Sequence, residues 1–366
     1  MRVVHYILLF YVASCFLSCS NDDDGDPIVD PTPAFNAPTV TVIAVDNGNL
    51  VELTVEGSTA AVTRVDLTSG SGVTPNDFVN ANENTLTWFR RQGPNFRVWK
   101  RDLDSKEMEM YDEICSISAE FPAFVLGSKE KIVAFSEIDF GQSSVANIRI
   151  TENGENCVLT QLFDTGILSA TISEDLWVFQ NSGTENTLQR ISLDSGEIKA
   201  ATALSETSVS ITQNEDNLYV FFNDRYHVYN ANTLSLSNVV PFIPSAGILL
   251  NNGFFTTQFS GNLMLTSLDV PQPSTLTDWP GVIDLSDGTL VSGDNLGIFL
   301  DSNLRQTEGY GDVSLENYTV DLESGIIAYT FSNGSTQHGI LFTNFDAEIL
   351  KIVDLELAPA QIYLTQ

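Results

Sequence analysis

The chain has 366 residues, and its 48 acidic residues outnumber its 16 lysines and arginines, which gives a formal net charge of −32 at pH 7. This balance argues against nucleic-acid binding, because affinity for nucleic acid comes largely from Lys and Arg side chains that neutralise phosphates. Hydrophobic residues make up 43% of the chain. That content is enough for a packed core, so the acidity does not predict intrinsic disorder.

The N-terminus has the pattern of a processing signal. Arg2 is followed by an apolar run of fifteen residues, Val3 to Leu17. A helix of that length is about 22 Å long, shorter than a hydrocarbon core of roughly 30 Å, so a permanent membrane span is not expected. We therefore predict that residues 1–18 are a signal peptide.

The residues Phe16-Leu17-Ser18-Cys19 resemble a loose lipobox, with a large apolar residue, a small residue at the cleavage point and then the cysteine. The resemblance implies cleavage before Cys19 and attachment of lipid, palmitate included, to its thiol. The mature protein would then be held on a membrane by that lipid. The alternative is an ordinary secretory signal that is cleaved nearby, with Cys19 a bystander.

An acidic run, Ser20 to Asp26, follows the cysteine directly. It resembles the lipoprotein export signal of Bacteroidota, in which acidic residues beside the lipidated cysteine direct a protein to the outside of the outer membrane. An EF-hand calcium loop that starts at Asp22 is the competing interpretation, but Pro33 stands at its twelfth position, where that motif needs glutamate. We therefore expect a lipid-anchored outer-membrane protein that faces the cell exterior.

Residues 19–38 form the predicted tether. Four prolines lie between Pro27 and Pro38, and proline-rich segments favour an extended, semi-rigid spacer. The remaining residues, 39–366, form the predicted folded domain, which we expect to be soluble and monomeric.

From residue 39 onward, short runs rich in Val, Ile, Phe, Tyr and Thr alternate with turns rich in Asn, Asp, Gly and Ser. This pattern is typical of strands joined by hairpins. One arrangement recurs, for example in residues 175–201 and 217–240: a strand, a polar turn, a second strand, a tight turn built on Asp or Asn, and a third strand. Asp and Asn suit the tight turn because they accept positive φ and bond to their own backbone.

The tight turn gives the period of the repeat. Successive turns are separated by 32 to 49 residues, with an average of 40. A period near 40 with four strands per unit resembles that of β-propellers such as kelch and WD repeats, although the WD dipeptide and the kelch double glycine are absent. The residues that set this register are Asp66, Asp104, Asn153, Asp194, Asn232, Asp269, Asp301 and Asp346.

We therefore predict an all-β fold, a single β-propeller of about seven or eight four-stranded blades. Eight repeat units can be counted, of which the first (Leu50 to Asn76) and the seventh (Thr289 to Tyr310) are degenerate. Thr39–Val45 and Gln361–Thr365 both alternate and have no other partner, so we expect them to pair and close the ring. The alternative fold is a pair of β-sandwich domains.

Two cysteines besides Cys19 remain in the mature chain. In an exported protein, Cys115 and Cys157 suggest a disulfide. It would contribute roughly 4–5 kcal/mol in the chain-entropy model. Two buried free thiols are the alternative, because the sequence does not place the two side chains together.

Sequence motifs for catalysis are missing. The mature chain has two histidines, His227 in an alternating strand and His338 in a hairpin turn. There is no HExxH, CxxC or GxSxG motif and no phosphate-binding glycine loop, so we expect neither a metal nor another cofactor. Paired carboxylates for glycosidic cleavage stay open. Those beside predicted strand ends are Glu137, Asp139, Glu174, Asp175, Glu215 and Asp216.

One repeat unit combines aromatic and basic residues in a candidate ligand patch. Such a surface could stack a sugar ring or hold an anionic group. The candidate residues are Trp88, Arg97, Trp99 and Arg101. Alternation predicts that the last three share one strand face. We favour a simpler interpretation, an outer blade strand whose cations pair with acidic neighbours such as Asp102 and Asp104.

The predicted function is a non-catalytic surface module that binds a protein partner or a glycan, or acts as a scaffold. The alternative is a surface glycan-degrading enzyme, a hydrolase or lyase, with carboxylates in the propeller cavity. An enzyme would show two close carboxylates in a deep axial pocket, one of them with a raised pKa. The fold does not decide between the two, because propellers host many functions.

Overall fold

The computed structural model describes residues 36–115, 120–139, 144–163, 166–182, 185–207, 210–242, 248–249, 258–269, 278–291, 304–305 and 309–365. The chain from Ala37 onward is one compact unit. The predicted signal peptide, Cys19, the tether up to residue 35 and the predicted turn residue Asp301 lie outside the described residues. Within the described part, no helix is long and apolar enough to cross a membrane.

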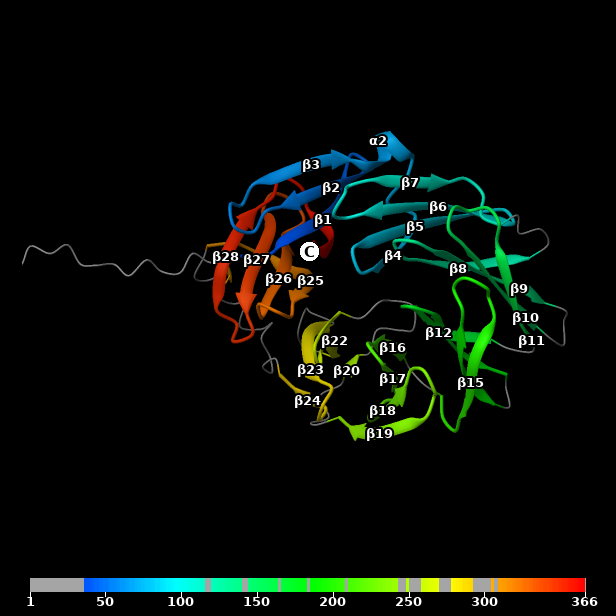
Figure 1. Cartoon of the computed structure of the whole chain (residues 1–366). Coiled ribbons are helices and arrows are strands. Elements are labelled where there is room, and N and C mark those ends of the chain that lie inside the picture. The colour runs from blue at the N-terminus through cyan, green and yellow to red at the C-terminus, as the bar shows by residue number, and fades with distance from the viewer. Residues whose placement is uncertain are drawn as a thin grey trace, which may run out of the picture. The chain divides into compact units, whose positions relative to one another are not determined.

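Seven antiparallel sheets stand in a ring, so the domain is a seven-bladed β-propeller (Figure 1). Blade 1 contains β29 (Pro359–Thr365), β1 (Thr39–Asp46), β2 (Asn49–Val55) and β3 (Val62–Asp66), and the short helix α2 (Leu67–Ser71) follows it. Blade 2 contains β4 (Phe78–Asn82), β5 (Thr85–Gln92), β6 (Asn95–Asp102) and β7 (Met108–Tyr111). Blade 3 contains β8 (Phe121–Gly127), β9 (Ile132–Asp139), β10 (Ser144–Thr151) and β11 (Val158–Phe163).

Blade 4 contains β12 (Gly166–Ile172), β13 (Leu176–Asn181), β14 (Asn186–Ile191) and β15 (Ile198–Leu204). Blade 5 contains β16 (Ser210–Asn214), β17 (Asn217–Phe221), β18 (Arg225–Asn230) and β19 (Leu236–Pro241). Blade 6 contains β20 (Ile248–Leu249), β21 (Phe259–Ser260), β22 (Leu263–Asp269), β23 (Asp278–Asp284) and β24 (Thr289–Leu290). Blade 7 contains β25 (Ser314–Asp321), β26 (Ile326–Ser332), β27 (His338–Asn344) and β28 (Ile349–Asp354).

The first and last strands of the domain close the ring within blade 1. Strand β1 pairs with β29, with Val40 opposite Leu364 and Val42 opposite Ile362, so the predicted closure is confirmed. The predicted propeller is also confirmed, and the ring excludes a pair of sandwiches. The count of eight repeat units was one too many. Thr289 and Leu290 form β24, the last strand of blade 6, so the weak seventh unit does not begin a blade of its own.

The turn between the third and fourth strands repeats with similar chemistry in several blades. In blade 2, the side chain of Asp102 accepts the backbone N–H of Asp104 (2.9 Å). Leu103, between them, is buried, and its N–H donates to the carbonyl of Asn84 in the turn between the first two strands (2.8 Å). In the corresponding turns of blades 3 to 7, a side-chain oxygen of Asp, Asn, Ser or Thr likewise accepts the backbone N–H of the residue two positions later. This repeated turn explains why the period can be read from the sequence.

Two of the predicted turn residues have other roles. Asp66 is the N-cap of α2, where its side chain accepts the N–H of Ser69 (2.9 Å). Asp269 ends β22, before the third strand of blade 6, so it belongs to the opposite edge of that blade. Acidic residues favour caps and several kinds of turn alike, which is why sequence spacing did not separate these roles.

The hydrophobic core lies between neighbouring blades. Ile43 and Leu50 of blade 1 pack with Trp88 and Trp99 of blade 2, and similar clusters join blades 3 and 4, 4 and 5, and 5 and 6. Because blades are covered on both faces, a central strand such as β26 is buried along its whole length. Each blade therefore needs its neighbours, and the ring must close for the fold to be stable.

Candidate functional site

The aromatic members of the predicted ligand patch belong to the core. Trp88 and Trp99 are 1% and 0% exposed and lie opposite one another in β5 and β6. The indole N–H of Trp99 donates to the carbonyl of Ser71 (2.9 Å). Because protein covers both rings, neither presents a face on which a sugar could stack.

The basic members of that patch bind carboxylates of the fold. The predicted shared face is confirmed, since Arg97 lies over the ring of Trp99 (5.9 Å) and Arg101 reaches Glu52 of blade 1. The Arg101–Glu52 ion pair spans 2.9 Å, with both side chains buried, and Arg97 pairs with Asp112. The simpler interpretation is right that these cations pair with carboxylates, but the partners of Arg97 and Arg101 are Asp112 and Glu52. The outer-strand position was wrong, because β6 is the third of the four strands of its blade.

Every Lys and Arg except Arg2 lies in the described residues, and each is engaged within the fold. Those that pair with carboxylates are Arg64, Arg90, Arg97, Lys100, Arg101, Lys106, Lys129, Lys131, Arg149, Arg190, Lys199 and Arg225. The other three, Arg91, Arg305 and Lys351, donate to backbone carbonyls. The carboxylates therefore outnumber the cations that could pair with them, and this surplus gives the chain its large negative net charge.

The predicted catalytic carboxylates lie in three different blades, 3, 4 and 5. Asp175 is 2% exposed and is held by Arg190 (2.5 Å) and Lys199 (2.6 Å), so two cations of its own blade occupy it. The side chain of Asp139 lies outside the described set. The solvent-exposed members are Glu137, Glu174, Glu215 and Asp216.

A carboxyl that the sequence did not single out lies on an innermost strand. Partial desolvation raises the pKa of Glu316 in β25, whose side chain is still exposed to solvent, and the nearby His338 opposes that shift. His338 is buried, and its Nδ1 has no hydrogen-bond partner among the described residues.

His227 in blade 5 contacts the rings of Phe222 and Tyr229, and burial lowers its pKa. No cluster of three or more metal-binding side chains occurs among the described residues.

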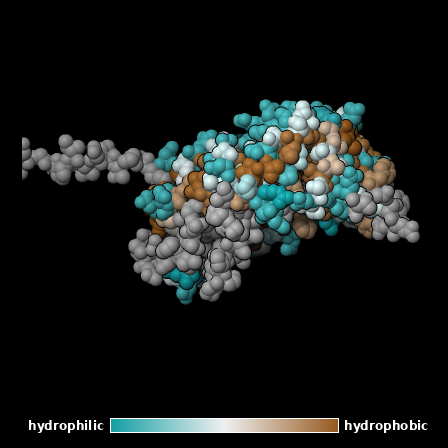
Figure 2. All heavy atoms as spheres, turned by 90° about the horizontal axis from the view of Figure 1, so that it is seen from below, coloured by the Kyte–Doolittle hydropathy of each residue, from teal (hydrophilic) through white to brown (hydrophobic). Residues whose placement is uncertain are grey.

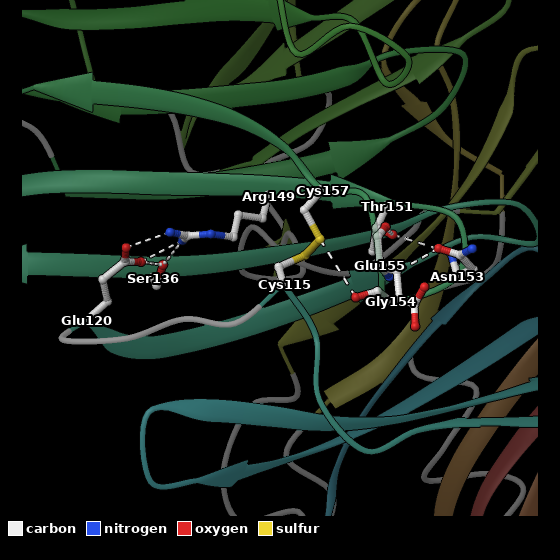
Figure 3. Close-up of a disulfide and its surroundings, with 9 residues drawn as sticks. All are labelled: Cys115, Glu120, Ser136, Arg149, Thr151, Asn153, Gly154, Glu155 and Cys157. Atoms are coloured by element: carbon white, nitrogen blue, oxygen red, sulfur yellow. Dashed lines mark hydrogen bonds and ion pairs between the residues drawn. A yellow bond between two sulfur atoms is a disulfide. The ribbon is translucent and has the colours of Figure 1, made fainter.

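A disulfide joins the end of blade 2 to blade 3. Cys115 bonds to Cys157, with Cα atoms 5.5 Å apart (Figure 3). The N–H of Cys115 also donates to the carbonyl of Gly154, in the turn after β10 (3.1 Å). The bond therefore fastens the segment after β7 to the outer hairpin of the next blade.

The close-up also shows a buried ion pair inside blade 3 (Figure 3). The guanidinium of Arg149 donates twice to Glu120 (2.6 Å each), and Ser136 contacts the same carboxylate. Burial alone would raise the pKa of Glu120, but the bonds from Arg149 and Ser136 lower it overall.

A polar cavity of about 310 Å³ opens between the outer turn of blade 2 and the first turn of blade 3. Lys100 closes one side, because its buried ammonium donates to the carbonyl of Lys129 (2.7 Å) and lies 3.5 Å from Glu109. Its lining is Thr85, Lys100, Asp102, Asp104, Ser105, Glu107, Glu109 and Lys129. The cavity has no aromatic wall, so its lining would meet a ligand through charge and hydrogen bonds alone.

Exposed phenylalanines are the feature that sequence reasoning missed. Phe121 is 71% exposed, Phe163 is 66% exposed and Phe78 is 58% exposed, and each begins or ends a strand. On the side of the domain seen in Figure 2, hydrophobic residues lie among hydrophilic ones, so single exposed apolar residues are common there. The phenylalanines differ from them by their size and by their position at strand ends.

No protein-family model and no curated protein matches the chain. A protein of known structure from Lactobacillus plantarum is 10% identical, with a TM-score of 0.50, and the match covers 90% of this chain and 99% of that one. Apo AztD from Citrobacter koseri is 9% identical, with a TM-score of 0.49, and the match covers 89% of this chain and 98% of that one. BamB from Moraxella catarrhalis is 10% identical, with a TM-score of 0.41, and the match covers 90% and 94%. The likeness to the Lactobacillus plantarum protein supports the propeller fold, and it assigns no function.

Proposed function

We propose that this chain is a lipid-anchored protein of the outer membrane, facing the cell exterior, whose propeller is a non-catalytic binding module. Its partner would be a protein, and a glycan is the second choice. The observation that carries this proposal is the distribution of charge. The cations of the domain are bound within the fold, whereas a surplus of carboxylates is left for contact with a partner.

Such a surface attracts positively charged partners. Opposite charge raises association rates and suppresses wrong partners more than it raises affinity by itself. Glycans without positive charge gain little from the electrostatic attraction of this acidic surface. Both tryptophans of the candidate sugar patch are also buried. A cationic polypeptide therefore fits the domain better than a neutral glycan does.

Export is supported by two separate features. The acidic run from Ser20 to Asp26 stands directly after Cys19, and a disulfide joins Cys115 to Cys157. Disulfides form and persist in oxidising compartments outside the cytosol. Lipidation would be tested by metabolic labelling with a palmitate analogue, which we expect to mark the wild-type chain and not the Cys19→Ala variant. Digestion by protease added to intact cells would test exposure, and full protection would contradict it.

A glycan-degrading enzyme is the second candidate, and one observation favours it. Glu316 lies on an innermost strand and has a raised pKa, as a general acid would. The charged group that influences it is His338, however, and not a second carboxylate.

A glycan array would separate the two functions when it is read for both binding and released oligosaccharide. We expect no released product from the wild-type chain. Release that is lost in Glu316→Gln would establish the enzyme and overturn the binding module.

A further inference from the structure

The N-terminal ends of the innermost strands in blades 2, 3 and 4 carry exposed apolar side chains. Phe78 is the first residue of β4, Phe121 is the first residue of β8, and Leu168 is the third residue of β12. They are 58%, 71% and 42% exposed. The innermost strands run in the same direction around a propeller, so these three ends lie on one face of the ring, beside its middle.

Contacts join the three blades that carry these side chains. Arg91 of blade 2 lies over the ring of Phe78 (5.8 Å), and its guanidinium donates to the carbonyl of Ala123 in β8. Ala123 and Ile167 of β12 both pack against the buried cluster that joins blades 3 and 4. Phe78 also stacks on Phe89, with ring centroids 5.2 Å apart. The exposed ring of Phe78 is therefore held in place by Phe89 and Arg91.

A carboxylate lies beside the most exposed ring. Phe121 is opposite Glu137 in the pairing of β8 with β9, and paired residues project from the same face of a sheet. Glu137 is exposed and forms no ion pair within the described part of the chain. Arg91, the cation nearest to Phe78, is already engaged with a backbone carbonyl.

We propose that Phe78, Phe121 and Leu168, with Glu137 at their edge, form a docking surface for a polypeptide segment that combines Lys or Arg with apolar side chains. This inference rests on the proposed binding function and names its surface and partner. Large exposed aromatic residues that gather on one face mark interaction sites. Charge complementarity selects the occupant, because an acidic domain whose cations are engaged repels an acidic segment and attracts a basic one.

The test uses purified full-length protein and three labelled peptides: alternating Lys and Phe, alternating Lys and Ala, and alternating Glu and Phe. Binding is measured by fluorescence anisotropy at low and high salt. We expect the Lys-Phe peptide to bind more tightly than the other two. Phe121→Ser and Phe78→Ser should each weaken it about tenfold, and Glu137→Gln about threefold. Leu236→Ser, which removes an exposed apolar side chain from the outer strand β19, is the matched control and should change binding less than about twofold.

The outcomes separate the docking surface from the proposed function. If Lys-Phe binding survives both phenylalanine substitutions, the docking surface is wrong, while binding of cationic partners stands. If the Glu-Phe peptide binds as tightly as the Lys-Phe peptide, the partner chemistry is wrong. If neither lysine peptide binds, both proposals fail. Unchanged thermal unfolding of each variant excludes a folding defect as the cause of lost binding.

Discussion

Two boundaries between neighbouring blades are stabilised by different kinds of contact. Between blades 1 and 2, the buried pair of Glu52 and Arg101 lies beside two buried tryptophans, and Lys106 approaches the same carboxylate (3.4 Å). Between blades 5 and 6, aromatic rings supply the contact, and the hydroxyl of Tyr226 donates to the carbonyl of Leu285 (2.7 Å).

The difference follows the distribution of charge along the sequence. Twelve of the sixteen basic residues lie between Arg64 and Lys199, so the first blades have cations to place in their boundaries. The later blades use tyrosine and phenylalanine instead. A boundary with paired charges depends on both partners, since a lone buried charge is costly. At an aromatic boundary, a single substitution of a tyrosine by phenylalanine removes one neutral hydrogen bond, which costs less than an unpaired buried charge.

Breaking the ionic boundary should have the largest effect. We expect Arg101→Met to lower the free energy of unfolding by about 3–5 kcal/mol, because it leaves Glu52 buried without its main partner. Tyr226→Phe, at the aromatic boundary, should cost about 1 kcal/mol for one lost hydrogen bond. Urea unfolding followed by tryptophan fluorescence measures both changes.

A double variant provides the control for the ionic boundary. Glu52→Gln combined with Arg101→Met removes both charges, so it should recover part of the stability that the single Arg101→Met change loses. A double variant that is less stable than the single one would show that packing of the Arg101 side chain matters more than its charge. Equal losses in Arg101→Met and Tyr226→Phe would end the distinction between the two boundaries.

Close backbone packing should have an intermediate effect, at the boundary between blades 2 and 3. A Cβ atom on Gly127 would lie 2.0 Å from Oγ1 of Thr87, whereas one on Gly166 would have no atom within 4 Å. We expect Gly127→Ala to cost about 1–3 kcal/mol by overpacking and Gly166→Ala to change stability by less than about 1 kcal/mol.

Thr87→Ala gives this prediction an internal check. The hydroxyl of Thr87 is buried and has no hydrogen-bond partner given in the described structure. Its removal should therefore restore part of the stability of the Gly127→Ala protein, measured in the same urea titration, although Cβ of residue 87 would still lie 2.9 Å from the new methyl carbon. A double variant no more stable than Gly127→Ala alone would place the strain elsewhere.

The propeller could be predicted because its signal is local. In blade 4, for example, the hydroxyl of Ser192 accepts the N–H groups of Asp194 and Ser195, and this turn chemistry recurs in the sequence once per blade. The number of repeat units was overestimated, because Asp269 lies at the opposite edge of blade 6 from the repeated turn, and the weak unit that begins at Thr289 is the last strand of that same blade. Closure could also be predicted, since two end strands had no other partner to pair with.

The candidate site could not be predicted in the same way. Glu52 and Arg101 are 49 residues apart, and nothing in either segment indicates the other. The sequence therefore presented Trp99 and Arg101 as a surface patch when they seal a boundary. Phe121 begins a strand in which Val125 is buried, and a hydrophobic residue has the same pattern whether its end of the strand is covered or open.

The smallest expected effect is a difference in how the ion pair inside blade 3 and the aromatic boundary between blades 5 and 6 respond to pH. Glu120, bound by Arg149 in blade 3, has a pKa below its usual value of 4.5. Its contribution to stability is therefore present above pH 4.5 and is lost as the pH falls through the lowered pKa. Burial raises the pKa of Tyr226 above its usual value of 10.0. The contribution of that tyrosine is present below pH 10.0 and is lost as the pH rises above it.

Low pH therefore tests the ion pair of blade 3, and high pH tests the boundary between blades 5 and 6. Hydrogen exchange should show blade 3 opening first on the acid side and blades 5 and 6 opening first on the alkaline side. Glu120→Gln should flatten the acid limb of stability against pH and leave the alkaline limb unchanged, and Tyr226→Phe should do the reverse. If each substitution flattened both limbs equally, the response would reflect the overall charge of an acidic chain, and neither the ion pair of blade 3 nor the aromatic boundary would set its own limb.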